Sequence, residues 1–393
     1  MTACRRGLIA LIALLACCAV GAPARAEGVG PLLIAKQGYF FVGGHYVDLP
    51  DGQFTAGQIY VEYQIPKKRR HPYPIVMIEG GGQSGSNFTG TPDGRDGWAQ
   101  YFLAQGYAVY IADQPGRGRS AFVAGAYGKN ALKPAKIIQD QFTAPERRAL
   151  WPQAHLHTQW PGTGVIGDAA FDQFEAEQLP DLLDATLLET LNREAGAALL
   201  DKIGPAILMT HSQSGAFGLV IADARPALVK AIVGIEPGGP PFYGIDLIGA
   251  PDWFKNGPLG KPWGLTRTPV QYAPAVSDPK ELSIAQQDKA DGPGLVRCWL
   301  QAGRPHELVN LKRVPQLMVT AEASFHAPWD HCNAAFLRQA GVKVDYVRLE
   351  QRGIHGNGHM MMLEKNNLQI AALIARWLNT ALPAHAAGKP ASR

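Results

Sequence analysis

A serine within Thr-His-Ser-Gln-Ser-Gly, residues 210–215, stands where a nucleophile can be exposed. The apolar run 206–209 precedes this segment, and the helix-compatible run 217–221 follows it. At a strand-to-helix turn, a hydroxyl lies beside free helical N–H groups that favour a developing negative charge. The pattern therefore predicts Ser212 as a nucleophile. Such a serine usually has a glycine two positions before it and another two positions after it, but this chain has Thr210 and Ser214 there. A turn centred on Ser214, or an ordinary polar turn, therefore remains an alternative.

A glycine run supplies the second chemical feature. The apolar run 74–78 ends in Glu-Gly-Gly-Gly-Gln-Ser-Gly. Without side chains, this backbone can approach a substrate carbonyl and direct an N–H group at its oxygen. We expect an oxyanion hole made by the N–H of Gln213 and that of Gly81 or Gly82. A phosphate-binding loop is the alternative, although the run is not Gly-x-Gly-x-x-Gly and lacks the Gly-Lys-Ser/Thr of a P-loop.

Alternating short apolar runs and longer amphipathic stretches must position these residues. Two runs, 37–47 and 58–64, alternate apolar and polar residues as half-buried antiparallel strands do. Six shorter and nearly continuous apolar runs are typical of strands buried on both faces of a parallel sheet. They are 74–78, 108–112, 206–209, 231–235, 316–319 and 344–349. With amphipathic helical stretches at 97–105, 171–200 and 360–378, the pattern predicts a mostly parallel, eight-stranded α/β sheet with helices on both faces.

Two long stretches, 122–167 and 238–303, interrupt the alternation and are rich in proline and aromatic residues. Loops of this length in a compact domain usually serve as lids or binding loops. We therefore expect two cap insertions over the site, with packed decoration as the alternative. Aromatic residues in them are expected to line an apolar substrate pocket: Trp151, Trp160, Trp253 and Phe254.

Further motifs follow the glycine run in a fixed order. Trp98, Leu103 and Gly106-Tyr107 precede Asp-Gln-Pro-Gly-Arg-Gly-Arg-Ser at 113–120. With the glycine run and the serine turn, this order resembles the α/β-hydrolase superfamily from about residue 39 to residue 378, the two insertions aligning poorly. The resemblance implies an α/β-hydrolase fold and a hydrolase, but it selects no substrate.

The resemblance also implies a general base near the C-terminal end. Superfamily members often carry a Gly-His pair after the last strand, at the start of a helix. Gly358-His359 matches that pattern, so His359 is the expected base, while His355 remains a substrate contact or a loop hydrogen-bonder. Two histidines four apart can bind a metal on a helix. The glycines between them argue against a helix and no third ligand is evident, so we expect no metal.

The third member of such a triad is a carboxylate that orients the imidazole. Most superfamily members place an aspartate after the seventh strand, where this chain has Ser324 instead. Glu236 follows the sixth predicted strand and preserves the order serine, acid, histidine. This arrangement looks like a small group of atypical secreted bacterial esterases whose acid is a glutamate at that place. Glu322 and Asp330 remain alternatives.

These residues together predict hydrolysis of a small or medium carboxylic ester through an acyl-enzyme, without a cofactor. The expected partner is therefore a small-molecule ester. A different acyl hydrolase, such as an amidase, peptidase or lactonase, is one alternative. A catalytically silent binding protein of the same fold is the other.

The N-terminus predicts export. Two arginines precede the apolar run 7–20, and Ala-Arg-Ala precedes Glu27. This is the pattern of a signal peptide, residues 1–26, cleaved before Glu27, and it implies a periplasmic or extracellular protein. An uncleaved anchor, or a lipoprotein modified at Cys17, is the alternative. Removing three arginines and no acid lowers the formal net charge from +4 to +1, so nothing predicts nucleic acid or a membrane surface as partner.

The remaining chain is expected to form one hydrolase domain, 27–382, followed by a flexible tail, 383–393. Cys298 and Cys332 are the cysteines outside the signal peptide. An oxidising compartment favours a disulfide between them; two buried thiols are the alternative.

Overall fold

The computed structural model of the chain describes residues 28–382. The predicted signal peptide with its cleavage before Glu27, the alternative lipoprotein site at Cys17 and the predicted tail 383–393 lie outside these residues. Within the described range, none of the helices has the length and apolar character needed to cross a lipid bilayer.

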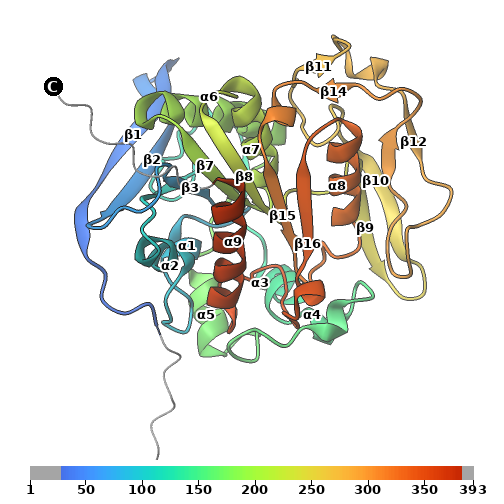
Figure 1. Cartoon of the computed structure of the whole chain (residues 1–393), viewed down its shortest axis with the longest axis horizontal. Coiled ribbons are helices and arrows are strands. Elements are labelled where there is room, and N and C mark those ends of the chain that lie inside the picture. Colours follow the sequence, from blue (N-terminus) through green and yellow to red (C-terminus); the bar gives the residue numbers. More distant parts are fainter. Residues whose placement is uncertain (1–27, 383–393) are drawn as a thin grey trace, which may run out of the picture.

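One eight-stranded sheet forms the centre of the molecule, in the order β1-β2-β4-β3-β7-β8-β15-β16 (Figure 1). The first two strands pair antiparallel with each other, β2 pairs antiparallel with β4, and all other neighbours are parallel. The strands are β1 (Ile34–Leu49), β2 (Gly52–Pro66), β3 (Ile75–Ile78), β4 (Val109–Asp113), β7 (Ala206–His211), β8 (Val229–Ile235), β15 (Gln316–Thr320) and β16 (Val344–Arg348). They match the eight predicted strands, so the predicted fold class is confirmed.

Helices cover both faces of the sheet (Figure 1). On one face lie α6 (Ala185–Ile203), α7 (Ser214–Ala224) and α8 (Asp330–Gln339), and on the other α2 (Trp98–Ala104) and α9 (Asn367–Ala381). Successive residues of β7 point to opposite faces, so Leu208 packs in the cluster with Phe217 of α7 and Met209 in the cluster with Ile374 of α9. Burial on both sides explains why the central strands are continuously apolar.

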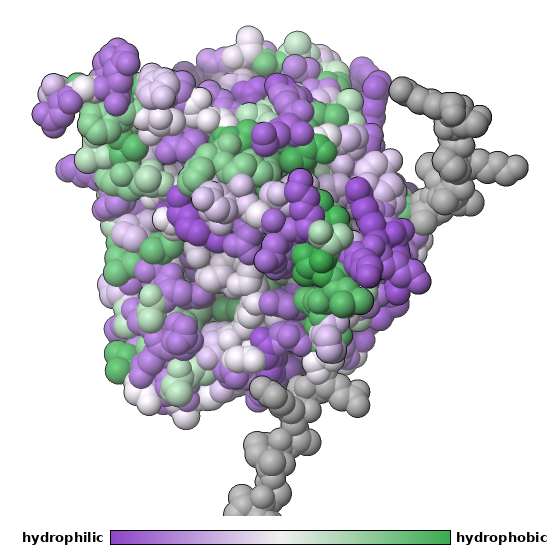
Figure 2. Space-filling view, turned by 90° about the vertical axis from the view of Figure 1, so that its left-hand side faces the viewer, coloured by the Kyte–Doolittle hydropathy of each residue, from purple (hydrophilic) through white to green (hydrophobic). Residues whose placement is uncertain are grey.

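The edge strand β1 differs from the central strands because its outer face meets solvent. It exposes Tyr39, Phe41 and Tyr46, and it lies along the left side of Figure 1. Figure 2 looks at that side of the molecule and shows hydrophobic surface broken up by hydrophilic residues.

The helix predicted over 171–200 is wrong in extent. The structure has α5 (Ala169–Ala176), then the short strand β6 (Asp181–Leu182), then α6. Pro180 cannot donate the hydrogen bond that a helix interior needs, and Asp184 caps α6 by accepting from the N–H groups of Thr186 and Leu187. Between α5 and α6, the chain thereby returns toward the carboxyl ends of the strands of the sheet.

The helix predicted over 360–378 begins later than expected, at the start of α9. Before it, the buried carboxylate of Glu364 accepts from the Gly358 N–H and from the Asn357 side chain. These contacts tie residues 357–364 together, and the chain forms turns over 359–366 before the helix begins.

The predicted insertions consist of short elements. Residues 122–167 contain β5 (Asn130–Ala131), which pairs with β6, α3 (Ala135–Ile138), a π-helical turn (Gln139–Thr143), α4 (Pro145–Arg148) and a 3-10 turn (Ala154–Leu156). Residues 238–303 contain the hairpin β9 (Phe242–Gly249) and β10 (Trp253–Lys261), the strand β11 (Tyr272–Ala273), a 3-10 turn (Pro279–Glu281), and the pair β12 (Ile284–Gln286) and β13 (Trp299–Gln301). Outside them lie α1 (Ser86–Thr89), β14 (Glu307–Leu308), which pairs with β11, and 3-10 turns at Leu311–Arg313 and Leu349–Arg352.

Figure 1 shows α3 and α4 at the lower end of the sheet and β9, β10 and β12 beside α8. A disulfide between Cys298 and Cys332 fastens the second insertion to α8. The predicted pairing of these two cysteines is thus present.

Candidate active site

Ser212 lies at the turn between β7 and α7 in a left-handed conformation, with φ of 52°. This conformation costs a non-glycine residue about 1–2 kcal/mol. Three backbone hydrogen bonds hold it: the Ser212 N–H donates to Ile235 O (2.9 Å), and its carbonyl accepts from Gly215 (2.9 Å) and Gly238 (2.7 Å). The turn exposes Ser212 to a pocket at the end of the sheet.

Ser214, the alternative centre, is fully buried. Its hydroxyl accepts from the His211 N–H (2.9 Å) and donates to Ile78 O at 2.8 Å, which ties the turn to β3. The glycine run also approaches this turn closely, because a Cβ on Gly80 would lie 3.1 Å from Ser212 Cβ. Of the two serines, Ser212 is the one that lines the pocket.

His359 lies in the loop between β16 and α9, not at the start of a helix as the resemblance implied. Its Nδ1 is 2.5 Å from Glu236 Oε2, and its ring packs against Phe142 and Phe325. Ser212 and His359 line the same pocket, without a direct hydrogen bond between their side chains in the described residues. Such contacts often tighten only when substrate is bound.

A buried ion pair supports the loop that carries His359. Glu364 accepts from the Gly358 N–H (2.9 Å) and from His157 Nε2 (2.8 Å). Burial alone would lower the pKa of His157, but hydrogen bonds to Glu146 and Glu364 raise it to about 9. At neutral pH a cationic His157 therefore faces the carboxylate that fixes the loop.

Glu236 follows β8 and is also left-handed, with φ of 46°. Its buried carboxylate accepts from the Ala321 N–H (2.8 Å) through Oε1 and from the Ser324 hydroxyl (2.6 Å) through Oε2, the oxygen that also faces His359. Ser324 stands where the superfamily aspartate was expected. Ser324 thus has a structural role in place of the expected aspartate. Its hydroxyl donates to Glu236, which reaches the His359 imidazole from the end of the neighbouring strand.

The two alternative carboxylates contact other histidines. Glu322 accepts from the Gly356 N–H (2.8 Å) and lies 3.1 Å from Nδ1 of His355, whose side chain is exposed. Asp330 lies 3.0 Å from His326 Nδ1. Glu236 is therefore the one of the three acids within hydrogen-bonding distance of His359.

Burial sets the protonation of the pair. It raises the pKa of the Glu236 carboxyl well above its ordinary value, and the nearby Asp330 raises it further. Burial also lowers the pKa of the His359 imidazole well below its ordinary value, with added lowering by His211 and His326. Burial therefore favours the neutral imidazole, which can accept a proton, while the hydrogen bonds from Ala321 and Ser324 favour the carboxylate form of Glu236.

The glycine loop is held by charged side chains that the sequence analysis did not single out. The Gly82 N–H donates to Asp181 Oδ1 at 2.9 Å. Arg117 is buried, and it donates to Gly80 O (2.8 Å) and Gln213 Oε1 (3.0 Å) and forms an ion pair with Asp181. Arg117 belongs to the recognisable 113–120 motif, whereas no local pattern marks Asp181.

The pocket has a volume of about 350 Å³. Its aromatic lining comes from Phe142, Phe325 and Trp329. The first insertion reaches it through Lys133, Gln141 and Phe142, and the second only through Gly238 and Gly239.

The four aromatic residues predicted to line a pocket do not line this one, although the structure describes all of them. Trp151 is buried and donates to Ala323 O, and Trp160 packs against Phe174. Trp253 and Phe254 lie in the β9–β10 hairpin. That prediction is corrected: Trp151 packs against Phe325, Trp160 belongs to a main core cluster, and Phe254 packs against the cluster around the disulfide.

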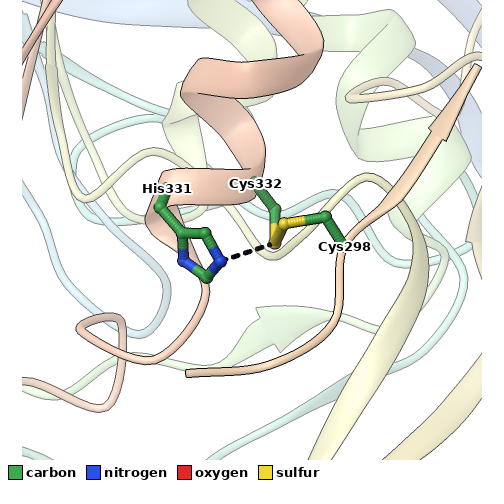
Figure 3. A group of neighbouring side chains, drawn as sticks. All are labelled: Cys298, His331 and Cys332. Carbon is green, nitrogen blue, oxygen red and sulfur yellow. Dashed lines mark hydrogen bonds between the residues drawn. A yellow bond between two sulfur atoms is a disulfide. The ribbon is translucent and has the colours of Figure 1, made fainter. Parts of the chain in front are cut away.

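Within residues 28–382, two groups of three side chains have ligand atoms within 4.8 Å of one another, the separation expected around a metal ion. In the first, Glu236 and His359 already face each other beside His326. In the second, Cys298 and Cys332 form the disulfide, and His331 Nε2 lies 3.5 Å from Cys332 Sγ (Figure 3). Disulfide sulfurs are not thiolates, which are the species that bind metals.

Comparison with known proteins gives the family. No protein-family model matches the chain. The probable secreted lipase phiG of Fungal sp. (strain ATCC 74256) is 45% identical over 344 residues, which cover 86% of this chain and 88% of that protein. A solved structure described as a novel bacterial esterase has a TM-score of 0.60 and 27% identity, covering 91% of this chain and 99% of that one. The chain belongs to the α/β-hydrolase superfamily, in one family with the secreted lipase phiG.

Proposed function

We propose that this protein is an exported serine esterase that cleaves small or medium carboxylic esters through an acyl-enzyme. The observation that carries the proposal is the 2.5 Å contact between His359 Nδ1 and Glu236, in a pocket that the strained Ser212 shares. The similarity to a secreted lipase and to a bacterial esterase supports an ester substrate and export.

In the proposed reaction, His359 Nε2 takes the Ser212 proton while the serine oxygen attacks the ester carbonyl. Glu236 keeps the imidazole in the tautomer that leaves Nε2 free and stabilises its cation. The tetrahedral intermediate collapses as His359 protonates the departing alcohol. Water, deprotonated by His359, then attacks the acyl-enzyme, and the acid is released with Ser212 restored.

The oxyanion of the intermediate needs preorganised donors. Gly81 and Gln213 both line the pocket beside Ser212, and we assign the oxyanion hole to their N–H groups. The Gly82 N–H is already directed at Asp181, so our proposal leaves it out.

The pocket favours a compact substrate. A volume of about 350 Å³ lies toward the lower end of the roughly 300–1,000 Å³ of small-molecule sites. A chain-length series of nitrophenyl esters should therefore show a maximum at short or medium acyl chains. Faster cleavage of matched amides would favour an amidase or peptidase instead.

Covalent labelling tests the nucleophile directly. The folded protein should take up one fluorophosphonate group on Ser212, and Ser212→Ala should abolish both the label and ester hydrolysis. Peptide mapping distinguishes Ser212 from Ser214. If well-folded protein takes up no label, the serine-hydrolase proposal is rejected and a catalytically silent protein of this fold is favoured.

A further inference from the structure

Charged side chains from three separate segments meet behind the glycine loop. Arg117 comes from the turn after β4, Lys133 from the first insertion and Asp181 from β6. Asp181 forms ion pairs with both cations and accepts the Gly82 N–H. One carboxylate thus holds two cations against the loop that lines the pocket.

The other nearby acids form no ion pair with Lys133 in the described residues. Glu79 lies 3.8 Å from Arg117, but it is fully buried, and burial raises its pKa to about 8. Most of it is therefore protonated at pH 7. Asp113 and Glu62 are engaged by Arg119. Arg117 and Lys133 therefore share the one carboxylate of Asp181, and neither Asp113 nor Glu62 forms an ion pair with Lys133 in the described residues.

Lys133 is the cation that faces the pocket. Arg117 is almost completely buried, whereas 34% of the Lys133 side chain is exposed. Lys133 lines the pocket with Ser212 and His359, and its Nζ lies 3.5 Å from where a Cβ on Gly81 would be. Its ammonium has three N–H donors, and Asp181, which also lines the pocket, is the one acceptor that it contacts in the described residues. The remaining donors can bind an anion through charge-assisted hydrogen bonds.

We propose that Lys133 is a specificity-determining residue and that the preferred ester carries a free carboxylate on its acyl or alcohol side. The inference rests on the proposed esterase function. An ester carbonyl is neutral before attack and gains from the N–H groups of the oxyanion hole. A carboxylate is charged from the start, so it is the substrate group that the remaining N–H donors of Lys133 favour.

Matched esters test this at pH 7 on the full mature protein. Monoethyl adipate and ethyl hexanoate have the same chain length and differ by a carboxylate on the acyl side. Carboxymethyl hexanoate places the carboxylate on the alcohol side. We expect kcat/KM to be about tenfold higher for one of the charged esters than for ethyl hexanoate, as one charge-assisted hydrogen bond would give.

Variants assign the preference to Lys133. Lys133→Met should remove the preference, so that kcat/KM falls about tenfold more for the preferred charged ester than for ethyl hexanoate, mainly through KM. Lys133→Arg should retain it. Lys136→Met is the matched control, because this exposed lysine of the same insertion pairs with Asp140 and does not line the pocket.

Three results would overturn the inference. The wild type could cleave ethyl hexanoate as fast as both charged esters, or Lys133→Met could leave a preference intact. An equal loss on charged and neutral esters would show that Lys133 acts on the oxyanion rather than on a substrate carboxylate. Failure of the esterase function itself looks different, since neither ester would be cleaved and Ser212 would take up no fluorophosphonate.

Discussion

At the scale of single residues, Glu236 is the unusual member of the site. Most superfamily members place the acid after β15, whereas Glu236 follows the neighbouring strand β8. Its Oε2 atom contacts His359 Nδ1 and also accepts a hydrogen bond from the Ser324 hydroxyl. A carboxylate with three donors around it can fix the imidazole even though burial disfavours its charge. Glu236 should therefore matter for the tautomer of His359 more than for the stability of the fold.

Glu236→Gln tests that role. The amide can still accept from Ala321, but its NH2 group would donate to His359 Nδ1 and hold the imidazole in the wrong tautomer. We expect kcat to fall by roughly 10³-fold or more, with the fold preserved. Ester hydrolysis and circular dichroism measure the two effects. Glu322→Gln is the matched control. A large loss of activity in Glu322→Gln, together with an active Glu236→Gln, would assign the triad acid to Glu322 instead of Glu236.

The lowered pKa of His359 predicts the pH dependence. The base must be neutral to act, so kcat/KM falls as the pH drops through the pKa of His359 in the free enzyme. Because burial holds that pKa well below 6.5, the acid limb of the profile should lie below pH 6.5.

A variant provides the control for this profile. His326 lowers the pKa of His359, so His326→Gln should move the acid limb to higher pH, whatever it does to the maximum rate. An acid limb at or above pH 6.5 in the wild type would contradict the assignment of His359 as the buried base.

The sequence could predict only those site residues that stand in a local pattern. Ser212 lies between a buried strand and a helix, and His359 follows a glycine after the last strand. Glu236 was a preference among three acids, because the choice depends on which of them reaches His359 in space. Phe142 enters the site from the first insertion, and Asp181 enters it from β6, which pairs with β5 of that insertion. No periodicity in the sequence marks such tertiary contacts.

At the scale of elements, the strands were easier to predict than the helices. A strand such as Ile75–Ile78 is buried along its whole length and has to be continuously apolar. The helical stretches depended on single side chains. Pro180 separates two helices, and the carboxylate of Glu364 delays the start of α9. Such hydrogen bonds override helical propensity without changing the hydrophobic pattern.

The ion pair beneath the His359 loop gives a prediction at this scale. His157→Gln removes the cation that faces the buried Glu364. Losing one partner of a buried pair should lower the free energy of unfolding by about 3 kcal/mol at pH 6. It should also lower kcat/KM, because Gly358 and His359 depend on Glu364. Urea denaturation and ester hydrolysis measure these effects, with the exposed His155→Gln as control.

The sign of the pH effect follows from the raised pKa. His157 titrates at about 9 in the folded chain and at 6.5 in its unperturbed state. Its contribution to stability is therefore complete below pH 6.5 and is lost as the pH rises through 9. Wild type and His157→Gln should differ less in stability at pH 9.5 than at pH 6. A difference that grows with pH would contradict a cationic His157.

At the scale of the whole molecule, the second insertion connects to the pocket through α8. Cys298 leads into β13, and Cys332 lies in the first turn of α8, one turn after Trp329 (Figure 3). Trp329 and Phe325 line the pocket and pack against each other. The disulfide thus fastens a remote hairpin region to the segment that forms one aromatic wall of the site.

Removing this disulfide should affect stability and substrate binding more than the chemistry. The two cysteines are 34 residues apart, and closing a loop of that size contributes about 4 kcal/mol by its chain entropy. The double variant Cys298→Ser, Cys332→Ser should therefore melt several degrees lower and show a raised KM, because Trp329 loses its anchor. Labelling of Ser212 should persist, since no catalytic group is changed. A reductant should lower the melting temperature and raise KM in the wild type but leave the double variant unchanged. If the reductant affects both proteins equally, the disulfide does not hold the aromatic wall formed by Phe325 and Trp329.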